Sequence, residues 1–316
     1  MHGAVRAAKR VGRGVLAATI MGLVLAGASP AVTPEPLVAS RFQEWEPAAA
    51  DGYLAWAQTS AKHPRHFDVV MRTGDGDPVR VNPRRSAAAH PSIDLGNPHL
   101  GDVMVVSLGR DLRDDARWDL AFFDVQDGTR LPALSGLNTR RAEREPSISG
   151  DQLLFARGEP TGSELPDTVL LYDLTDGSVT KLDSASRGVA NAGAVAGDWA
   201  TWQKCGPHAC FIFRRQLSTG VTSRLHVAAP ILWSPTVTSN GTVFVVRSGH
   251  ACGQRSRIVR VPVLGPARTV AAFPPGVDAS DLDVFEHDGA VDLYFSRVTC
   301  RDFDFDVYRI TDVESA

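Results

Sequence analysis

The sequence has no excess of basic charge and, after its N-terminal segment, no apolar run that could span a membrane. Lys and Arg number 33 against 36 Asp and Glu, which gives a formal net charge of −3. General affinity for nucleic acid needs many phosphate-neutralising Lys and Arg side chains. A membrane helix needs about 20 predominantly apolar residues. We therefore expect neither a nucleic-acid partner nor a membrane span in the mature protein.

Motifs of common enzyme classes are also absent from the sequence. It has no Gly-x-Ser-x-Gly elbow of the hydrolases. It has no P-loop, no Gly-x-Gly-x-x-Gly fingerprint and no His-Glu-x-x-His. The sequence therefore identifies no catalytic residue, no resident metal site and no cofactor.

The N-terminal segment has the layout of a secretory signal peptide. Residues 1–14 are basic, residues 15–26 are apolar, and Ala26-Gly27-Ala28 is a small-x-small cleavage site. Because the apolar part is short for a bilayer span, cleavage after residue 28 is favoured over an uncleaved anchor. Loss of the four cations in residues 1–28 takes the formal net charge from −3 to −7. We expect release into the extracellular space or a periplasm-like compartment, with a short linker at 29–36 and one domain at 37–316.

A tight-turn pair recurs along the rest of the chain. The pairs are Asp51-Gly52, Gly101-Asp102, Gly150-Asp151, Gly197-Asp198, Asn240-Gly241 and Asp288-Gly289. Gly, Asn and Asp tolerate positive φ and therefore suit tight hairpin turns. A short β-rich run follows each pair, and a second hairpin follows that run. Each unit thus contains four strands in about 47 residues, the size of a propeller blade.

The two ends of the repeat array complement each other. The last unit stops after its third strand, Phe305–Ile310, whereas an unmatched strand, Leu37–Phe42, precedes the first unit. Pairing these two strands hides both sheet edges. The sequence therefore predicts an all-β, six-bladed β-propeller of four-stranded blades, closed by an N-terminal strand. Two β-sandwiches are the alternative, but a sandwich does not require a regular period.

Short motifs within the units resemble the repeat of TolB-type propellers. The third strands open on Phe67-Asp68-Val69, Trp118-Asp119-Leu120 and Phe305-Asp306-Val307, and a second strand reads Leu153-Leu154-Phe155-Ala156. Pro146-Ser147 and Ser234-Pro235 resemble the Pro and Ser that precede the turn in that repeat. The chain departs from the family because it lacks the Ser-Pro-Asp-Gly tetrapeptide and TolB's N-terminal domain. The resemblance implies the fold and no particular partner.

The loops divide into a tight set and a long set. Turns after the first and third strands of a blade lie on one face, and connections after the second and fourth strands lie on the other, which we call the long-loop face. Binding residues concentrate in long loops on rigid scaffolds. All four cysteines fall on this face, and in an oxidising compartment we expect Cys205–Cys210 and Cys252–Cys300 disulfides. A metal site with the adjacent His208 and His250 is the alternative, although the spacing matches no zinc pattern.

Arginines cluster in the connections that lead into the second, third and fourth blades. They are Arg84, Arg85, Arg140, Arg141 and Arg187. Because these connections enter the innermost strands, the guanidiniums are candidates for a ring that binds a small carboxylate or phosphate anion. Solvated surface arginines are the simpler interpretation.

Two groups of acids are candidate metal ligands. The run Asp302–Asp306 fails the calcium-loop pattern because Val307 and Val313 stand where Gly and Glu are needed. Strand alternation, with Phe303 and Phe305 facing inward, explains it better. Asp278, Asp281 and Asp283 are the first candidates for an axial metal of the kind that lactonase propellers use.

Two hypotheses of function follow. The first is a secreted binding scaffold that engages a protein or a cell-envelope component through the long-loop face. The alternative is a small-molecule enzyme, lactonase-like or another hydrolase, with an axial metal. Three or more carboxylates or histidines within coordination reach of one metal ion at the axis would favour the enzyme.

Overall fold

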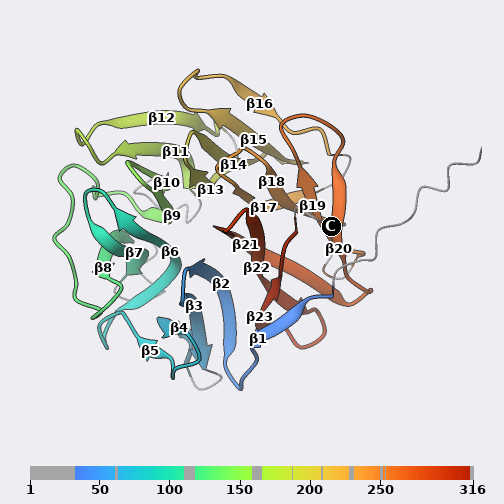
Figure 1. The fold of residues 1–316 in the computed structure, drawn as a ribbon, viewed down its shortest axis with the longest axis horizontal. Coiled ribbons are helices and arrows are strands. Elements are labelled where there is room, and N and C mark those ends of the chain that lie inside the picture. The colour runs from blue at the N-terminus through green and yellow to red at the C-terminus, as the bar shows by residue number, and fades with distance from the viewer. Residues whose placement is uncertain are drawn as a thin grey trace, which may run out of the picture. The chain divides into compact units, whose positions relative to one another are not determined.

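Six antiparallel sheets surround a common axis in the computed structural model (Figure 1). The structure describes residues 33–60, 63–109, 118–158, 166–186, 188–207, 209–227, 231–249, 252 and 254–313. The predicted signal peptide lies outside this part of the chain. Five sheets have four strands and one has three. In the described residues we find no helix that could cross a lipid bilayer.

The first strand of each blade lines the axis. These strands are β2 (Gln43–Ala50), β6 (Ala87–Asn97), β9 (Glu143–Ser149), β13 (Val189–Ala196), β17 (Ile231–Val237) and β21 (Val277–His287). Each contacts the first strand of the next blade, and β21 contacts β2, so the ring is closed (Figure 1).

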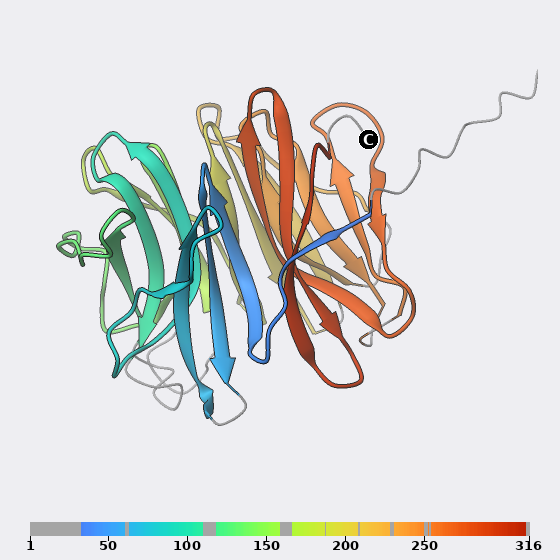
Figure 2. The same ribbon diagram turned by 60° about the horizontal axis from the view of Figure 1, so that its bottom comes forward.

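The second and third strands form the body of each blade. The second strands are β3 (Tyr53–Ser60), β7 (Gly101–Gly109), β10 (Gln152–Gly158), β14 (Trp199–Cys205), β18 (Val243–Ser248) and β22 (Ala290–Thr299). The third strands are β4 (His63–Thr73), β8 (Asp119–Asp124), β11 (Pro166–Asp173), β15 (Cys210–Gln216), β19 (Arg257–Val261) and β23 (Asp304–Ile310). Figure 2 shows these strands running between the two faces of the ring.

Outer strands complete five of the six blades. They are β5 (Val79–Arg80), β12 (Val179–Ser184), β16 (Thr222–Arg224), β20 (Arg268–Ala272) and β1 (Glu35–Val38). The predicted outer strand at 129–131 is reduced to one bridge between Phe123 and Arg130. Pro132 follows directly and has no N–H to extend a ladder, which accounts for the missing strand.

The N-terminal strand closes the ring as predicted. β1 pairs antiparallel with β23, with Glu35 opposite Arg309 and Val38 opposite Val307. The strand begins at Glu35, two residues before the predicted start at Leu37, and ends at Val38, before the predicted end at Phe42. Arg309 also forms a 2.8 Å ion pair with Glu35, which ties the first and last strands together.

Apolar side chains pack between neighbouring blades rather than in one central core. Between the last and first blades, for example, Trp56 and Val70 pack against Tyr294 and Val307. Similar clusters fill the other five interfaces. Because the core lies between the sheets, the axis is left for polar side chains.

One aromatic residue is not where strand alternation predicts it. Phe303 lies in the turn before β23 and is 59% exposed, so its predicted inward orientation is wrong. Phe305, within β23, is half-buried and lies edge-on to Trp45 at 6.0 Å between ring centroids. Alternation therefore holds from Asp304 onward, where the strand begins.

Candidate functional site: the axial cavity

Every axial strand contains a β-bulge at the same place. Five of the six bulges have a non-glycine residue at left-handed φ, between 46° and 54°: Glu46, His90, Glu145, Ser234 and Asp281. Proline follows four of these residues. Left-handed φ is costly for residues with a Cβ and persists where the surroundings impose it. The bulges re-aim five polar side chains at one level of the axis.

The sixth bulge, in β13, has Gly193 at the corresponding position, without a left-handed φ. A Cβ on Gly193 would lie 2.7 Å from the Thr201 carbonyl oxygen and 2.8 Å from Pro235. Only glycine therefore fits this close approach between blades.

Hydrogen bonds between blades hold the bulged backbone. The N–H of Glu46 donates to Ser296 Oγ at 3.0 Å, and the N–H of Asp281 donates to Ser234 Oγ at 3.0 Å. The N–H of His90 donates to Glu46 Oε2 at 2.7 Å. These acceptors belong to the preceding blade, so the strained conformations depend on the closed ring.

The bulges enclose a cavity of about 300 Å³ on the propeller axis, which we call the axial cavity. All six axial strands line it. The residues used below are Glu46, His90, Glu145, Trp233, Asp281 and Asp283. A second space of about 300 Å³ shares Ser92, Ser147, Ala194 and Asp283 with it and continues toward the tight-turn face.

An ion pair occupies one side of the axial cavity. His90 Nε2 lies 3.0 Å from Glu46 Oε1. Burial lowers the pKa of His90, but the charge of Glu46, its hydrogen bond and the charges of Glu145 and Asp281 outweigh burial and raise that pKa to about 9. His90 is therefore charged at neutral pH and neutralises Glu46.

Three further carboxyls of the cavity titrate near neutrality. Burial raises the pKa of Glu145 to about 7, and burial together with the charge of Glu46 raises the pKa of Asp281 to about 6. Burial also raises the pKa of Asp283 to about 7, although Asp283 accepts a 2.8 Å hydrogen bond from the N–H of Ala49. Perturbed groups that converge in a cavity mark a candidate functional site.

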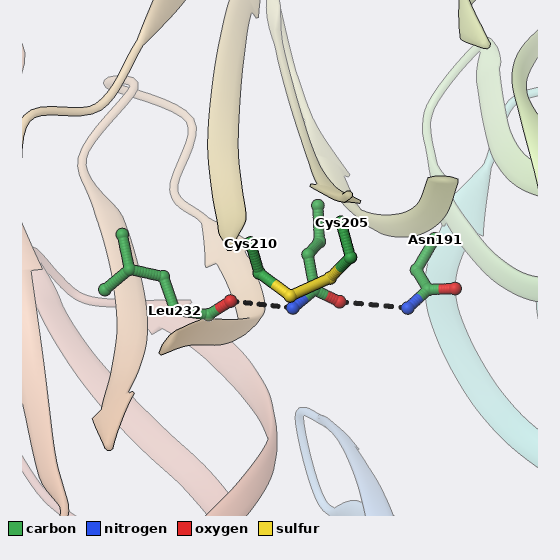
Figure 3. The surroundings of a disulfide bond; sticks show 5 residues. Asn191, Cys205, Cys210 and Leu232 are labelled. Atoms are coloured by element: carbon green, nitrogen blue, oxygen red, sulfur yellow. Dashed lines mark hydrogen bonds between the residues drawn. A yellow bond between two sulfur atoms is a disulfide. The ribbon is translucent and has the colours of Figure 1, made fainter. Parts of the chain in front are cut away.

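Gln203 of β14 lines the cavity and is hydrogen-bonded to Asn191 and Leu232, which Figure 3 shows beside the first disulfide. Its side chain accepts a 2.9 Å hydrogen bond from Asn191 Nδ2 and donates one of 2.7 Å to the Leu232 carbonyl oxygen. Two residues later, Cys205 is joined to Cys210 at the base of the β14–β15 hairpin. The cavity therefore lies in the half of the axis next to the long-loop face, and a cross-link stabilises its rim.

Both predicted disulfides are present. Cys252–Cys300 joins the long-loop connections of the fifth and sixth blades across a sequence separation of 48 residues. Since all four cysteines are disulfide-bonded, they are not metal ligands. His208 and His250, the partners in the alternative metal site, lie outside the described residues.

The predicted arginine ring does not line the axial cavity in the part of the chain that is described. Arg84, Arg85 and Arg140 are exposed and Arg141 is half-buried, while Arg187 lies outside the described residues. Arg84 and Arg85 lie before β6, which starts at Ala87. The cavity begins further along this strand, at His90. Anion binding by these arginines stays a prediction.

The three acids considered for an axial metal are separated. Asp281 and Asp283 line the cavity, but Asp278 is buried between blades, where Ser248 Oγ donates to it at 3.2 Å. Among the described residues, no three His, Cys, Asp or Glu side chains lie within reach of one metal ion.

Sequence reasoning missed Glu46, His90 and Glu145. A readable signal exists, because Glu46, His90, Glu145 and Ser234 each precede a proline. Two of these prolines, Pro146 and Pro235, also belong to the TolB-type repeat motifs, which alone would account for them. Recognising all four X-Pro pairs as one ring would have pointed to the axis.

Comparisons with known proteins support the fold. No family model and no curated protein matches the chain. TolB from Acinetobacter baumannii superposes with a TM-score of 0.54 at 16% identity, covering 87% of this chain and 65% of that one. A putative TolB from Agrobacterium tumefaciens gives 0.57 at 15% identity, covering 86% and 91%. A chain of a nidogen/laminin complex gives 0.50 at 6% identity, covering 84% and 91%.

The chain spans 65% of the length of the Acinetobacter protein. At these identities the likeness establishes a shared architecture, a TolB-like six-bladed propeller, as the repeat motifs predict.

Proposed function

From the TolB-like propeller fold and the axial cavity, we propose that this chain is a secreted binding scaffold that engages a protein or a cell-envelope component through its long-loop face. The position of the axial cavity carries the proposal, because the cavity lies next to that face and is lined by strained, charged residues. Rigid scaffolds place binding residues on loops and in concave sites.

The construction of the long-loop face supports the proposal. Both disulfides lie on it and fix its loops, which lowers the entropy lost when a partner binds. Phe303 stands 59% exposed three residues after Cys300. Exposed aromatics beside arginines are typical anchors of protein interfaces.

The two disulfides support secretion. Disulfides persist mainly in oxidising compartments outside the cytosol. The predicted signal peptide, residues 1–28, provides the route. Sequencing the N-terminus of the exported protein tests this, because cleavage as predicted begins the mature chain at Ser29.

One of the matched structures is a complex of nidogen with laminin. It supports the general class, a propeller within a protein–protein complex. Fold alone does not assign a partner, so the proposal rests on the site.

Site-specific photo-cross-linking tests which face binds. A benzophenone amino acid replaces Phe303 on the long-loop face in one variant and Leu264, 88% exposed on the tight-turn face, in the matched control. Each variant is irradiated in the envelope fraction of the producing cell, after thermal unfolding confirms that it is folded.

We expect one dominant covalent adduct from position 303 and none from position 264. Adducts of equal yield from both positions, or from position 264 alone, would overturn the assignment of the long-loop face. The absence of an adduct at both positions would overturn the envelope partner.

A further inference from the structure

We propose that the axial cavity binds one organic cation, an ammonium or guanidinium group on a short apolar stem. This inference rests on the proposed function and names the chemistry that a ligand brings to it. Three features of the described residues carry it: the charge of the lining, an unpartnered buried oxygen and an aromatic wall.

The lining has a surplus of negative charge. Its acids are Glu46, Glu145, Asp281 and Asp283, and it contains no Lys or Arg. His90 forms its 3.0 Å ion pair with Glu46, and its single charge also acts on Glu145 and Asp281. Arg144 lies outside the lining, with its guanidinium 5.5 Å from the Trp118 ring centroid, and its charge also lowers the pKa of Glu145. Four carboxyls and one imidazolium therefore leave the lining with an excess of acidic groups.

Glu145 lacks a donor that a cation would supply. Its Oε2 atom is buried and has no hydrogen-bond partner in the protein. The Glu145 carboxyl is otherwise hydrogen-bonded by the backbone N–H of Ala192, so its unfilled position is at Oε2. Asp281 and Asp283 each accept a 2.8 Å hydrogen bond from the protein, from Ser280 Oγ and the N–H of Ala49 respectively. An unmade hydrogen bond at a buried carboxyl is costly, and an N–H donor from a ligand would complete it.

Burial already makes ionisation of this carboxyl unfavourable, since it raises the pKa of Glu145 to about 7. A bound cation stabilises the carboxylate and takes the place of the proton.

The apolar part of the lining selects an organic cation. Trp233 lines the cavity and also packs against the apolar cluster between the last two blades, and Pro47, Pro91 and Pro235 line it from neighbouring blades. An indole face attracts ammonium and guanidinium groups, and apolar rings accommodate a methylene stem. A volume of about 300 Å³ is at the lower end for ligand sites, which suits one side chain or one small amine.

The cation that binds in the cavity could come from two sources. A Lys or Arg side chain of a partner could enter from the long-loop face, or a free amine could diffuse in. A short peptide with one central lysine and free butylamine distinguish them, because only a protein partner gains affinity from the flanking backbone.

The test is a titration of the purified mature protein with butylamine, butylguanidinium and neutral 1-butanol at constant ionic strength. Thermal unfolding and calorimetry are the measurements. We expect the two cations to raise the unfolding midpoint in a saturable way and 1-butanol to have no such effect. The lysine peptide is expected to bind more tightly than its norleucine analogue, and a peptide no tighter than butylamine identifies a free amine as the ligand class.

Variants locate the site. Glu145→Gln keeps the shape of the side chain and should weaken cation binding about tenfold or more, because a charged hydrogen bond is lost. Trp233→Leu should weaken it more than Trp233→Phe, which keeps an aromatic face. The control Asp302→Asn removes a carboxylate that is 70% exposed on the same face and should leave binding unchanged.

Equal responses to butylamine and 1-butanol, or equal cation affinity in the wild type and Glu145→Gln, would overturn the inference. So would stabilisation by calcium or zinc with none by the amines. If position 303 cross-links to a partner but no cation binds, only the proposed cation site is refuted. If cations bind but no cross-link forms, only the proposed envelope partner is refuted.

Discussion

Replacing Glu145 by glutamine should make the protein more stable at alkaline pH, although it removes a charged group from the candidate site. The carboxyl faces a cavity that also contains Glu46, His90, Asp281 and Asp283. Its Oε2 has no partner, and its pKa rises from 4.5 in an ordinary setting to about 7. An ionised Glu145 therefore opposes folding.

The sign follows from proton linkage. Between pH 4.5 and 7 the folded protein holds the Glu145 proton more tightly than the unfolded chain does, so the stability contributed by this group is lost as pH rises through that window. At about 1.4 kcal/mol per pKa unit, the full shift corresponds to about 3 kcal/mol at pH 8. Because Glu145 is partly accessible from the cavity, screening by water reduces this, and we expect about 1–3 kcal/mol.

Urea unfolding of the wild type and Glu145→Gln at pH 5 and pH 8 measures the effect. The variant should exceed the wild type in unfolding free energy at pH 8 and by much less at pH 5. Asp302→Asn, an exposed carboxylate, serves as the control and should show no pH-dependent gain. A variant that is less stable than the wild type at pH 8, or a gain that is independent of pH, would refute the reasoning.

Four further predictions follow from the same contacts. Deletion of residues 33–38 should lower the unfolding midpoint by several degrees in a thermal melt, because it exposes the edge of β23; an unchanged midpoint would contradict closure by β1. Serine at Cys252 and Cys300 should cost about 4 kcal/mol in urea unfolding against about 2 for Cys205 and Cys210, since the first pair closes the longer loop; equal losses would contradict this. Butylamine affinity by calorimetry should fall as pH decreases from 8 to 5, because protons compete for carboxyls whose pKa values lie at about 6 and 7; a flat profile would place the cation elsewhere. If the arginines of the long-loop face bind anions, citrate at low salt should raise the melting midpoint, and alanine at these positions should abolish the rise.

The fold was accessible from the sequence because its signals are local and repeated. Asp51-Gly52 and Asn240-Gly241 specify turns by their own conformational preferences, and both lie between paired strands in the structure. The unmatched strand at the N-terminus and the missing one at the C-terminus predicted closure. Disulfide pairing followed from the assignment of cysteines to loops of the same or adjacent blades.

The candidate site was less accessible because it depends on contacts between distant residues. Ser296 accepts the N–H of Glu46 across 250 positions of sequence, and no local propensity predicts left-handed φ before Pro47. The arginine prediction placed the functional level at the strand entries, whereas the bulge places it three residues into β6, at His90. The predicted alternation extended back to Phe303, which lies in the turn just before β23 begins at Asp304.

One measurement tests most directly whether the partner bound at the long-loop face also occupies the axial cavity. The benzophenone variant at position 303 is irradiated in the envelope fraction with saturating butylamine and, in parallel, with the same concentration of 1-butanol. If a partner inserts a cationic side chain into the axial cavity, butylamine should strongly reduce the yield of the adduct while 1-butanol leaves it unchanged. An adduct whose yield is the same in both solutions would contradict the claim that this propeller captures its partner through a cation in the cavity.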